Sequence, residues 1–347
     1  MSDTLSDVLR AVRLTGAVFF AVDATAPWVT ETPAAREIAS RIIPGAEHVI
    51  DYHLVSSGSC WGGIVGEPPI HLETGDMIVF PQGDAHVMSS APGMRGTPDL
   101  GVYRPYEEQL PITIRARAGD GQPAEVICGF LGCDARPFNP LLATLPRTIH
   151  VPRPVADDGV IGQLVKLALL ETAARRAGGE CVLARLSELL FVEVVRRHLA
   201  TLAPEHGGWL SGLRDPQIGR ALAKLHDRPA HPWSLEELAG AVGMSRSALA
   251  ERFAHFVGVP PMQYLAQWRM QLAATLLSGT AIGLAELAER VGYGSEAALS
   301  RAFKRWVGVA PALWRQGKRG GGDPPAEPAA IATDQDPPAV RRPLPLP

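Results

Sequence analysis

The stretch of sequence that decides the fold is SLEELAGAVGMSRSALAERFAHFVGVPP, Ser234 to Pro261, because the chain repeats it. A second copy, GLAELAERVGYGSEAALSRAFKRWVGVAP, covers Gly283 to Pro311. Equivalent residues lie 49 positions apart before a central turn and 50 apart after it, where Phe253 matches Phe303. Self-similarity at a fixed period predicts two copies of one structural unit.

Each copy has the pattern of a helix, a tight turn and a second helix. Gly243 and Gly292 suit the turn, and Ser245 and Ser295 are typical N-caps of the helix that follows. Between the copies, PPMQYLAQWRMQLAATLLSG (Pro260 to Gly279) predicts a long amphipathic spacer helix. Two helix-turn-helix units on one rigid spacer would place their recognition helices in successive major grooves of DNA, about 34 Å apart. A plain helical array is the alternative, but two copies are few for a solenoid.

The charge distribution separates this segment from the rest of the chain. Residues 215–319 carry 13 Lys and Arg against 8 Asp and Glu, whereas residues 1–214 carry 18 against 24 and residues 320–347 carry 2 against 4. The net charge of -3 therefore hides a basic C-terminal segment joined to an acidic N-terminal one. This asymmetry favours a negatively charged partner that only the C-terminal part contacts.

The sequence before the repeat changes from a strand pattern to a helix pattern. From Gly16 to about Val151, short apolar runs such as HVIDYHLV alternate with Gly, Pro, Asp and Ser, which predicts a β-barrel or sandwich. From Asp157 to Leu202, apolar residues recur at helical spacing around a Gly pair, which predicts an antiparallel helical hairpin. A wide apolar face on its second helix either packs on the barrel or forms a dimer interface; its residues are Leu183, Leu186, Leu189, Leu190 and Val194.

The motif GDMIVFPQGDAH, Gly75 to His86, lies inside the predicted barrel. A β-run meets a turn at Gly83 that delivers His86 to the start of the next strand. The spacing of Gly, Pro, Gly and His resembles the second motif of the cupin barrels, in which that histidine binds a metal. The first cupin motif is represented only by HLVSSGSCW, with His53 and no second histidine two residues away. A three-histidine enzyme site is therefore not expected.

The repeat itself resembles a family. From Trp233 to Arg315 the chain looks like the DNA-binding domain of AraC-family transcriptional regulators, and GYGSEAALSRAFKRWVGVAPALWR resembles that family's signature around its second recognition helix. The preceding barrel, with CGFLGCDARPFNPLLATLP from Cys128, resembles the cupin-type sensor domains of one branch of the family. The resemblance implies an α+β protein with an N-terminal cupin-like β-barrel, a helical hairpin linker, and a C-terminal all-α domain with two helix-turn-helix units.

The resemblance also implies which residues contact DNA. On the first recognition helix it implies Ser247, Ala250 and Glu251 at the bases, with Ser245 as the cap and Arg246 and Arg252 nearer phosphates. On the second it implies Glu296, Ala297, Ser300 and Arg301 at the bases, with Ser295 as the cap and Lys304 at the backbone. Glu251 stands where relatives often carry a basic residue; it either accepts from a cytosine amino group or pairs with a neighbouring arginine. Arg301 is the strongest single candidate, because arginine binds guanine or phosphate in a bidentate manner.

The barrel contains a second set of candidate residues, His53, His86, Cys128 and Cys133. Two histidines and two thiols are a ligand set for Zn²⁺ or another divalent metal. The two cysteines could instead form a thiol pair that oxidises reversibly. A third interpretation makes Cys128 a core residue and His86 a hydrogen-bonded turn histidine. No acid or base pair accompanies the histidines, so catalysis is not expected.

These observations predict a DNA-binding transcription regulator and not an enzyme, with a metalloenzyme of the cupin type carrying a helical appendage as the alternative. The partners expected are double-stranded promoter DNA, a second copy of the chain, an unknown effector (small molecule, metal or oxidant) and RNA polymerase, with activation the commoner outcome in the family. No 18-residue apolar run or signal-peptide pattern is present and the four cysteines are scattered, so we expect a cytoplasmic protein without membrane contact. The predicted parts are a cupin-like sensor domain (1–152), a hairpin for dimerisation (153–208), the DNA-binding domain (209–318) and a disordered tail (319–347).

Overall fold

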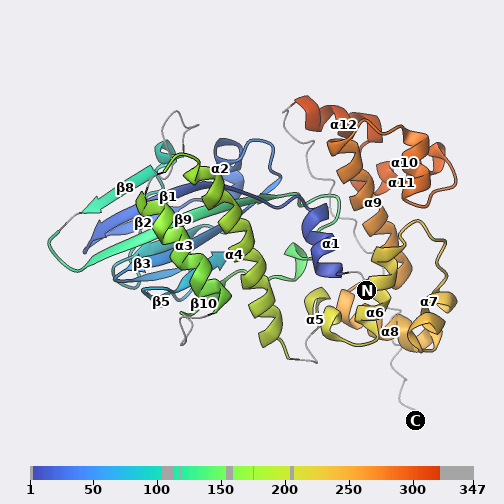
Figure 1. Ribbon diagram of the computed structural model, residues 1–347, viewed down its shortest axis with the longest axis horizontal. Helices are drawn as coiled ribbons and strands as arrows, with labels where there is room; N and C mark the ends of the chain where they lie inside the picture. Colours follow the sequence, from blue (N-terminus) through green and yellow to red (C-terminus); the bar gives the residue numbers. More distant parts are fainter. Residues whose placement is uncertain are drawn as a thin grey trace, which may run out of the picture.

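The computed structural model describes residues 3–103, 112–117, 119–153, 159–174, 176–203 and 207–320. The predicted tail therefore lies outside the described residues, apart from its first two. A β-rich domain and a helical domain lie side by side, with two long helices across the face of the first (Figure 1). The α+β class, the helical hairpin and the two helix-turn-helix units are confirmed. None of the helices in the described ranges is long and apolar enough to cross a membrane.

The N-terminal domain is built from two sheets packed face to face. The first has six strands in the order β10-β6-β3-β9-β1-β8, and the second has four in the order β2-β7-β4-β5. The strands of the first sheet are β1 (Thr15–Thr25), β3 (His48–Ser57), β6 (Met77–Phe80), β8 (Ile112–Arg117), β9 (Pro123–Cys133) and β10 (Ile149–Val151). Those of the second are β2 (Val29–Thr32), β4 (Ser59–Ile64), β5 (Ile70–Glu73) and β7 (His86–Ser89).

Strand alternation divides the residues of the large sheet between two cores. Successive side chains of a strand point to opposite faces, so Val49 and Val55 on β3 enter the core between the sheets while Ile50 and Leu54 enter the core on the outer face. The inner core combines aliphatic side chains with aromatic rings, some of which meet edge to face, such as Phe20 with Phe130 at 5.8 Å. The interior of the domain is therefore packed with side chains.

The cupin motif forms as the sequence predicts. β6 ends at Phe80, and the turn through Gly83 leads into β7, which begins at His86. Gly83 has φ +64, and a Cβ there would lie 2.5 Å from the Cβ of Ala35 and 2.8 Å from the Val49 carbonyl oxygen. Only glycine fits this turn, because a side chain would meet both backbone strain and a clash.

Helices cover the ends and the outer face of the large sheet. α1 (Thr4–Ala11) precedes β1, and α2 (Ala35–Ile42) packs its apolar face into the inner core. α3 (Val160–Ala174) and α4 (Gly179–Thr201) form the hairpin and lie across the sheet (Figure 1). Short 3-10 turns lie at Leu100–Val102 (η1) and Leu142–Thr144 (η2).

The C-terminal domain consists of eight helices within the described residues. α5 (Trp209–Arg214) and α6 (Ile218–Asp227) lead into the first unit, α7 (Leu235–Val242) and α8 (Arg246–Val257). α9 (Pro261–Gly279) is the spacer, and α10 (Leu284–Arg290), α11 (Glu296–Val307) and α12 (Pro311–Gly320) complete the second unit. Figure 1 shows α9 running between the two units.

The apolar residues gather into three clusters whose boundaries differ from those of the sequence domains. One cluster fills the space between the two sheets. A second begins under the hairpin, continues through α1 and ends in the first helix-turn-helix unit, including Leu249 and Phe253. The third belongs to the second unit alone, with Leu299 and Phe303 at its centre. The first unit thus shares a core with the N-terminal domain, and the second does not.

Candidate DNA interface and buried polar chain

The second helix of each unit begins in the same way. Ser245 accepts a hydrogen bond from Ala248 N at 3.3 Å, and Ser295 accepts one from Ala298 N at 3.2 Å. These hydroxyls satisfy donors that the first turn of a helix leaves free. The preceding glycines, Gly243 with φ +75 and Gly292 with φ +79, turn the chain between the helices. The repeat therefore produces two equivalent helices, α8 and α11, as predicted.

The outward residues of both helices are available for contact with a partner. Phe253 and Phe303 are fully buried, which fixes the opposite side of each helix toward solvent. Arg301 and Lys304 on α11 are exposed, and within the described residues neither has an ion-pair partner. The remaining predicted positions are exposed (Ser245, Arg246, Ser247, Glu251, Arg252, Ser295, Glu296, Ala297) or half-buried (Ala250, Ser300).

Three charged residues of α8 differ in what they contact. Arg252 donates to Asp215 from Nε at 3.1 Å and lies 5.8 Å from the centre of the Phe256 ring, so it is held at the side of the helix. Arg246 lies 3.8 Å from Glu236, a weak pairing between exposed groups. Glu251 forms no ion pair with any described residue. Arg252 is thus already engaged, whereas Glu251 keeps its carboxylate free.

The sequence-predicted barrel residues form a hydrogen-bonded chain between the two sheets. His53 on β3 lies 2.8 Å from Cys128 Sγ through Nδ1 and 2.7 Å from His86 Nε2 through its own Nε2. His86 Nδ1 lies 2.8 Å from the carbonyl oxygen of Asp84. All three side chains are buried, and the His86 ring stacks on Phe80 with centroids 4.1 Å apart.

The protons in this chain run in one direction. A carbonyl oxygen only accepts, so His86 Nδ1–H donates to Asp84. Burial lowers the pKa of His86 to about 4, so near pH 7 the ring is neutral and its Nε2 accepts from His53. His53 is also neutral, because burial lowers its pKa well below the usual value, so its Nδ1 accepts from the Cys128 thiol. Burial raises the pKa of Cys128, which keeps that thiol protonated.

Two further residues belong to this cluster and were not predicted. Asp51 is 1% exposed, and within the described residues neither carboxylate oxygen has a hydrogen-bond partner; Oδ2 lies 3.8 Å from His86 Nδ1. Burial raises the pKa of Asp51 well above its usual value. Cys60 on β4 is also buried, and after burial it is the next cause of the raised pKa of Cys128. The alternation of β3 contained the signal for Asp51, because it stands two residues before His53.

Cys133 corrects the predicted ligand set. It belongs to the outer core and Cys128 to the inner one. Both lie on β9, where an odd separation of five residues sends two side chains to opposite faces of the sheet. The run CGFLGC therefore cannot place both sulfurs on one metal, nor can these two cysteines pair as a disulfide.

The remaining residues do not fit a metal ion either. The two imidazole Nε2 atoms are 2.7 Å apart, a separation that suits a shared proton. A tetrahedral zinc with Zn–N bonds near 2.0 Å would hold two nitrogens about 3.3 Å apart. No group of three or more His, Cys, Asp or Glu that could hold a metal ion occurs in the described ranges. The arrangement is a closed polar chain, and a metal would have to break it.

Buried neutral histidines make the protein acid-sensitive. Burial lowers the pKa of His226, in α6, to about 4, against about 6.5 for an unfolded histidine. Between these values the unfolded chain binds more protons, so the stability from this group is complete above pH 6.5 and falls as the pH falls toward 4. At about 1.4 kcal/mol per pKa unit, the loss is ~3 kcal/mol. His86 acts in the same sense, whereas Asp51, with its raised pKa, acts in the opposite one.

Urea unfolding of the parent and of a His226→Gln variant between pH 7 and pH 4.5 isolates this group. His226 Nε2 lies 2.8 Å from the Tyr264 hydroxyl, and a glutamine oxygen can still accept from that hydroxyl, so we expect the variant to fold. Its proton uptake on unfolding should be smaller by up to one proton, so its stability should fall less steeply with acid. Identical slopes for parent and variant would show that His226 titrates normally.

The geometry defines a class of protein: a β-sandwich domain joined through a helical hairpin to two units whose recognition helices are exposed and capped alike. The chain matches the family described as Cupin over residues 3–200 and the family described as Helix-turn-helix domain over residues 238–317. An AraC-like transcription regulator of Streptomyces lividans is 31% identical over 315 residues, 90% of this chain and 98% of that protein. One of Streptomyces antibioticus is 33% identical, covering 79% and 89%. The regulator AlkR of Acinetobacter baylyi is 30% identical, covering 78% and 89%.

This chain belongs to the AraC-like family of DNA-binding transcription regulators, and its N-terminal domain is a cupin.

Proposed function

We propose that this regulator recognises promoter DNA through α8 and α11 together. The observation that carries the proposal is the equivalent presentation of both helices, each capped by serine and fixed by a buried phenylalanine. Arg301 and Lys304, which form no ion pair with the described residues, supply cations for guanine or phosphate, while Glu251 supplies an acceptor suited to the amino group of cytosine. Arg252 then contributes mainly by holding α8 on Asp215.

A binding titration against duplex DNA at several salt concentrations tests this proposal. Each neutralised phosphate releases counterions, so the affinity should fall linearly with salt on a double-logarithmic scale, with a slope of about -0.9 per phosphate. A cupin metalloenzyme with a helical appendage would show no such dependence. Binding that is weak and indifferent to salt would contradict the proposal.

We further propose that two copies associate through the hairpin. Leu183, Leu186, Leu190 and Val194 on α4 are buried against the N-terminal domain, so that part of the predicted face is already covered. An apolar stripe remains on the solvent side of both helices; it consists of Val160, Leu167 and Leu170 on α3 and Val182 and Leu189 on α4, with Leu170 57% and Leu189 52% exposed. Several large exposed apolar residues on two helices that pack against each other are typical of a protein interface.

Placing glutamates in the stripe should separate the dimer. The double variant Leu167→Glu, Leu189→Glu buries two charges in the proposed interface, so we expect a monomer at micromolar concentration in analytical ultracentrifugation. Both positions face solvent within one chain, so the monomer should still fold and unfold cooperatively, with a thermal midpoint lowered only by the lost association. Gln122→Glu, at an exposed position before β9, adds one negative charge away from the stripe and should stay dimeric. A dimer that survives the double change would place the interface elsewhere.

The cupin domain, in this proposal, is a sensor for a small molecule or an oxidant and not a catalyst. Its histidines are bonded to each other and to the Cys128 thiol, and burial keeps that thiol and the neighbouring Asp51 carboxyl protonated, which does not suit a general base or a nucleophile. β3 links the chain to the hairpin: Tyr52, next to His53, donates to Ser187 of α4 at 2.6 Å, and Ser187 donates to Leu183 O. A disturbance at His53 can therefore reach the proposed dimer helices through one strand.

A transcription assay with purified RNA polymerase would test the sensor and the activator role together. Candidate effectors and mild oxidants are added to the parent and to the double variant His86→Ala, Cys128→Ser. An effector that raises transcription only with the parent would support activation through the hydrogen-bonded histidines and Cys128. Equal transcription with parent and variant under every condition would show that these side chains do not transmit the signal.

A further inference from the structure

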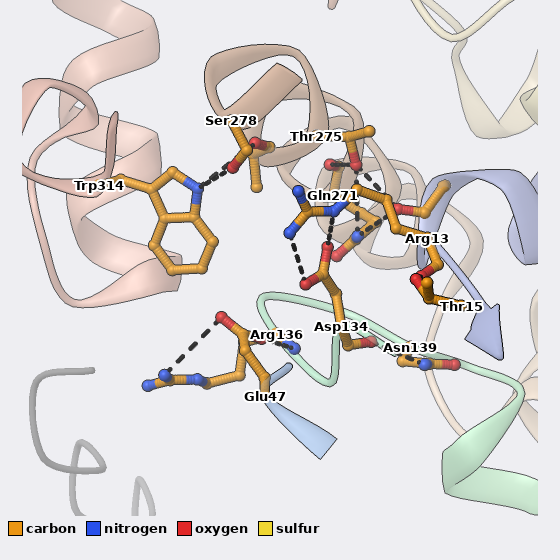
Figure 2. A network of polar contacts seen from close by, with 12 residues as sticks. Arg13, Thr15, Glu47, Asp134, Arg136, Asn139, Gln271, Thr275, Ser278 and Trp314 are labelled. Atoms are coloured by element: carbon orange, nitrogen blue, oxygen red, sulfur yellow. Dashed lines mark hydrogen bonds and ion pairs between the residues drawn. The ribbon is translucent and has the colours of Figure 1, made fainter. Parts of the chain in front are cut away.

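A network of polar contacts joins the N-terminal end of the cupin domain to the spacer helix α9 (Figure 2). Gln271 Nε2 donates to the carbonyl oxygen of Ala11 at 3.0 Å, and the Thr275 hydroxyl lies 2.9 Å from the same oxygen. On its other side, Gln271 Oε1 accepts from the backbone N–H of Phe138 at 3.0 Å. We call these contacts the clasp.

The clasp is a buried contact in which the polar groups of Gln271 are satisfied by hydrogen bonds to the cupin domain. Ala11 is the last residue of α1, where a helix leaves carbonyl oxygens without partners. Gln271 is 1% exposed, and its amide uses a donor and its acceptor on two separate segments of the cupin domain. Withdrawing those segments would leave a buried amide unsatisfied, which is costly.

The cupin side of the clasp is itself cross-linked. Arg13, which follows α1 with φ +49, binds Asp134 in a bidentate manner at 2.6 and 2.8 Å. Asp134 N donates to Val12 O at 2.8 Å, and Asn139 Nδ2 donates to Asp134 O at 2.9 Å. The end of α1 and the loop after β9 are therefore fixed to each other, and both contact Gln271.

The helix that the clasp holds belongs to both DNA-binding units. Tyr264, Leu265 and Trp268 of α9 lie in the core shared with the first unit. Met270, Ala273, Ala274 and Leu277 lie in the core of the second unit. Gln271 and Thr275 point to the cupin domain. One helix thus touches all three parts, so its position sets that of both recognition helices.

A second contact brings α1 to α6, the helix that precedes the first unit. Trp209 Nε1 donates to the Tyr264 hydroxyl at 2.9 Å, and that hydroxyl lies 2.8 Å from His226 Nε2. With the hydroxyl donating, His226 is neutral and carries its proton on Nδ1, which lies 3.9 Å from Asp7 Oδ2 on α1. α1 therefore rests on α6 as well as on α9.

We propose that Gln271 is the positioning residue through which the cupin domain holds the spacer helix, and with it both helix-turn-helix units, in one orientation. A signal that moves α1 or the loop from Asp134 to Asn139 then changes DNA binding by releasing the clasp. This inference rests on the proposed function, because orientation matters only if the cupin domain governs DNA binding.

A distance measurement between the two halves tests the inference in the full-length chain. Cys181 is the exposed cysteine of the four, and Glu289→Cys adds a second exposed label site on α10. The labelled chain is diluted with an excess of unlabelled chain, so that a dimer carries at most one labelled copy. Pulsed electron resonance between nitroxides at these positions should then give one narrow distance distribution. In Gln271→Ala we expect a broadened or shifted distribution, together with a change of about fivefold or more in affinity for a bound duplex, the lower range of usual allosteric coupling.

Two further variants make the test specific. Ser278→Ala removes a polar group from the same helix, but Ser278 contacts Ala274 and Trp314 and not the cupin domain, so the parent distribution should remain. Arg13→Gln loosens the clasp from the cupin side at a residue 38% exposed, and it decides the matter if Gln271→Ala does not fold. Folded Gln271→Ala or Arg13→Gln chains with the parent distribution would overturn the inference. If the parent bound no DNA while Gln271→Ala still changed the distance distribution, the proposed function would be refuted and the role of the clasp in positioning α9 would stand.

Discussion

Replacing Arg301 by alanine is expected to lower the affinity for a cognate duplex by about 10- to 100-fold. Arg301 is exposed on α11, and its guanidinium has no ion-pair partner among the described residues. A bidentate contact from arginine to guanine is worth about 1–3 kcal/mol of discrimination. If Arg301 instead binds phosphate, the loss will be uniform across sequences and the salt slope will fall by about one. Fluorescence anisotropy with matched and single-substituted duplexes measures both quantities.

Arg290→Ala is the matched control for this prediction. Arg290 lies on α10 outside the recognition helix and pairs with Glu286 at 3.1 Å, both side chains being exposed. We expect its loss to change the affinity little, since such pairs contribute little. Equal affinities for Arg301→Ala and Arg290→Ala would show that α11 does not read DNA through Arg301.

Replacing Phe303 by alanine is expected to unfold the second helix-turn-helix unit while the rest of the protein stays folded. Phe303 is fully buried and meets Trp314 edge to face at 6.0 Å. Truncating a buried phenylalanine costs about 3–5 kcal/mol. The core that loses the phenylalanine ring belongs to the second unit alone. Hydrogen exchange should therefore accelerate in α10, α11 and α12, with little change in the cupin domain or in α7 and α8.

Phe253→Ala makes the equivalent change in the other copy of the repeat. Phe253 is also fully buried, but its core continues through α1 to the outer face of the large sheet. We expect exchange to accelerate in the first unit, α1 and the hairpin together. The contrast between these two variants tests the division into cores, and equal, local effects of both would refute it.

The repeat explains why the DNA-binding half could be predicted in detail from the sequence. Its caps, its turn glycines and its inward phenylalanines are local features, each determined by residues within one or two helical turns. Gly83 is a similar case in the cupin domain, because a turn with positive φ can be predicted from the glycine in the turn itself. Local physics sufficed for these elements.

The buried chain shows where local reasoning failed. The sequence brought His53, His86 and Cys128 together correctly, but Cys133 was assigned to the same site because the two cysteines are close along the chain. In a strand, closeness along the chain matters less than parity, and an odd spacing separates faces. Asp51 was overlooked although its parity matches that of His53.

The clasp could not be predicted from the sequence at all. Gln271 stands in an apolar helical run, and its polarity alone does not name a partner. Its contacts, Ala11 and Phe138, lie 260 and 133 residues away in the chain. Helix α1 was likewise not anticipated, although Asp3 caps it and Val8 and Ala11 form its buried face; the surfaces of α6 and α9 that it meets are distant in the sequence.

Selection of bound fragments from random duplex DNA by the purified full-length protein tests the central claim most directly. A regulator that reads DNA through α8 and α11 should enrich one motif with two short conserved elements about one helical turn apart. Arg301→Ala should lose the information in one element and keep the other. Recovery of DNA without any enriched motif, or of a motif with a single element that Arg301→Ala leaves intact, would contradict recognition by both helices.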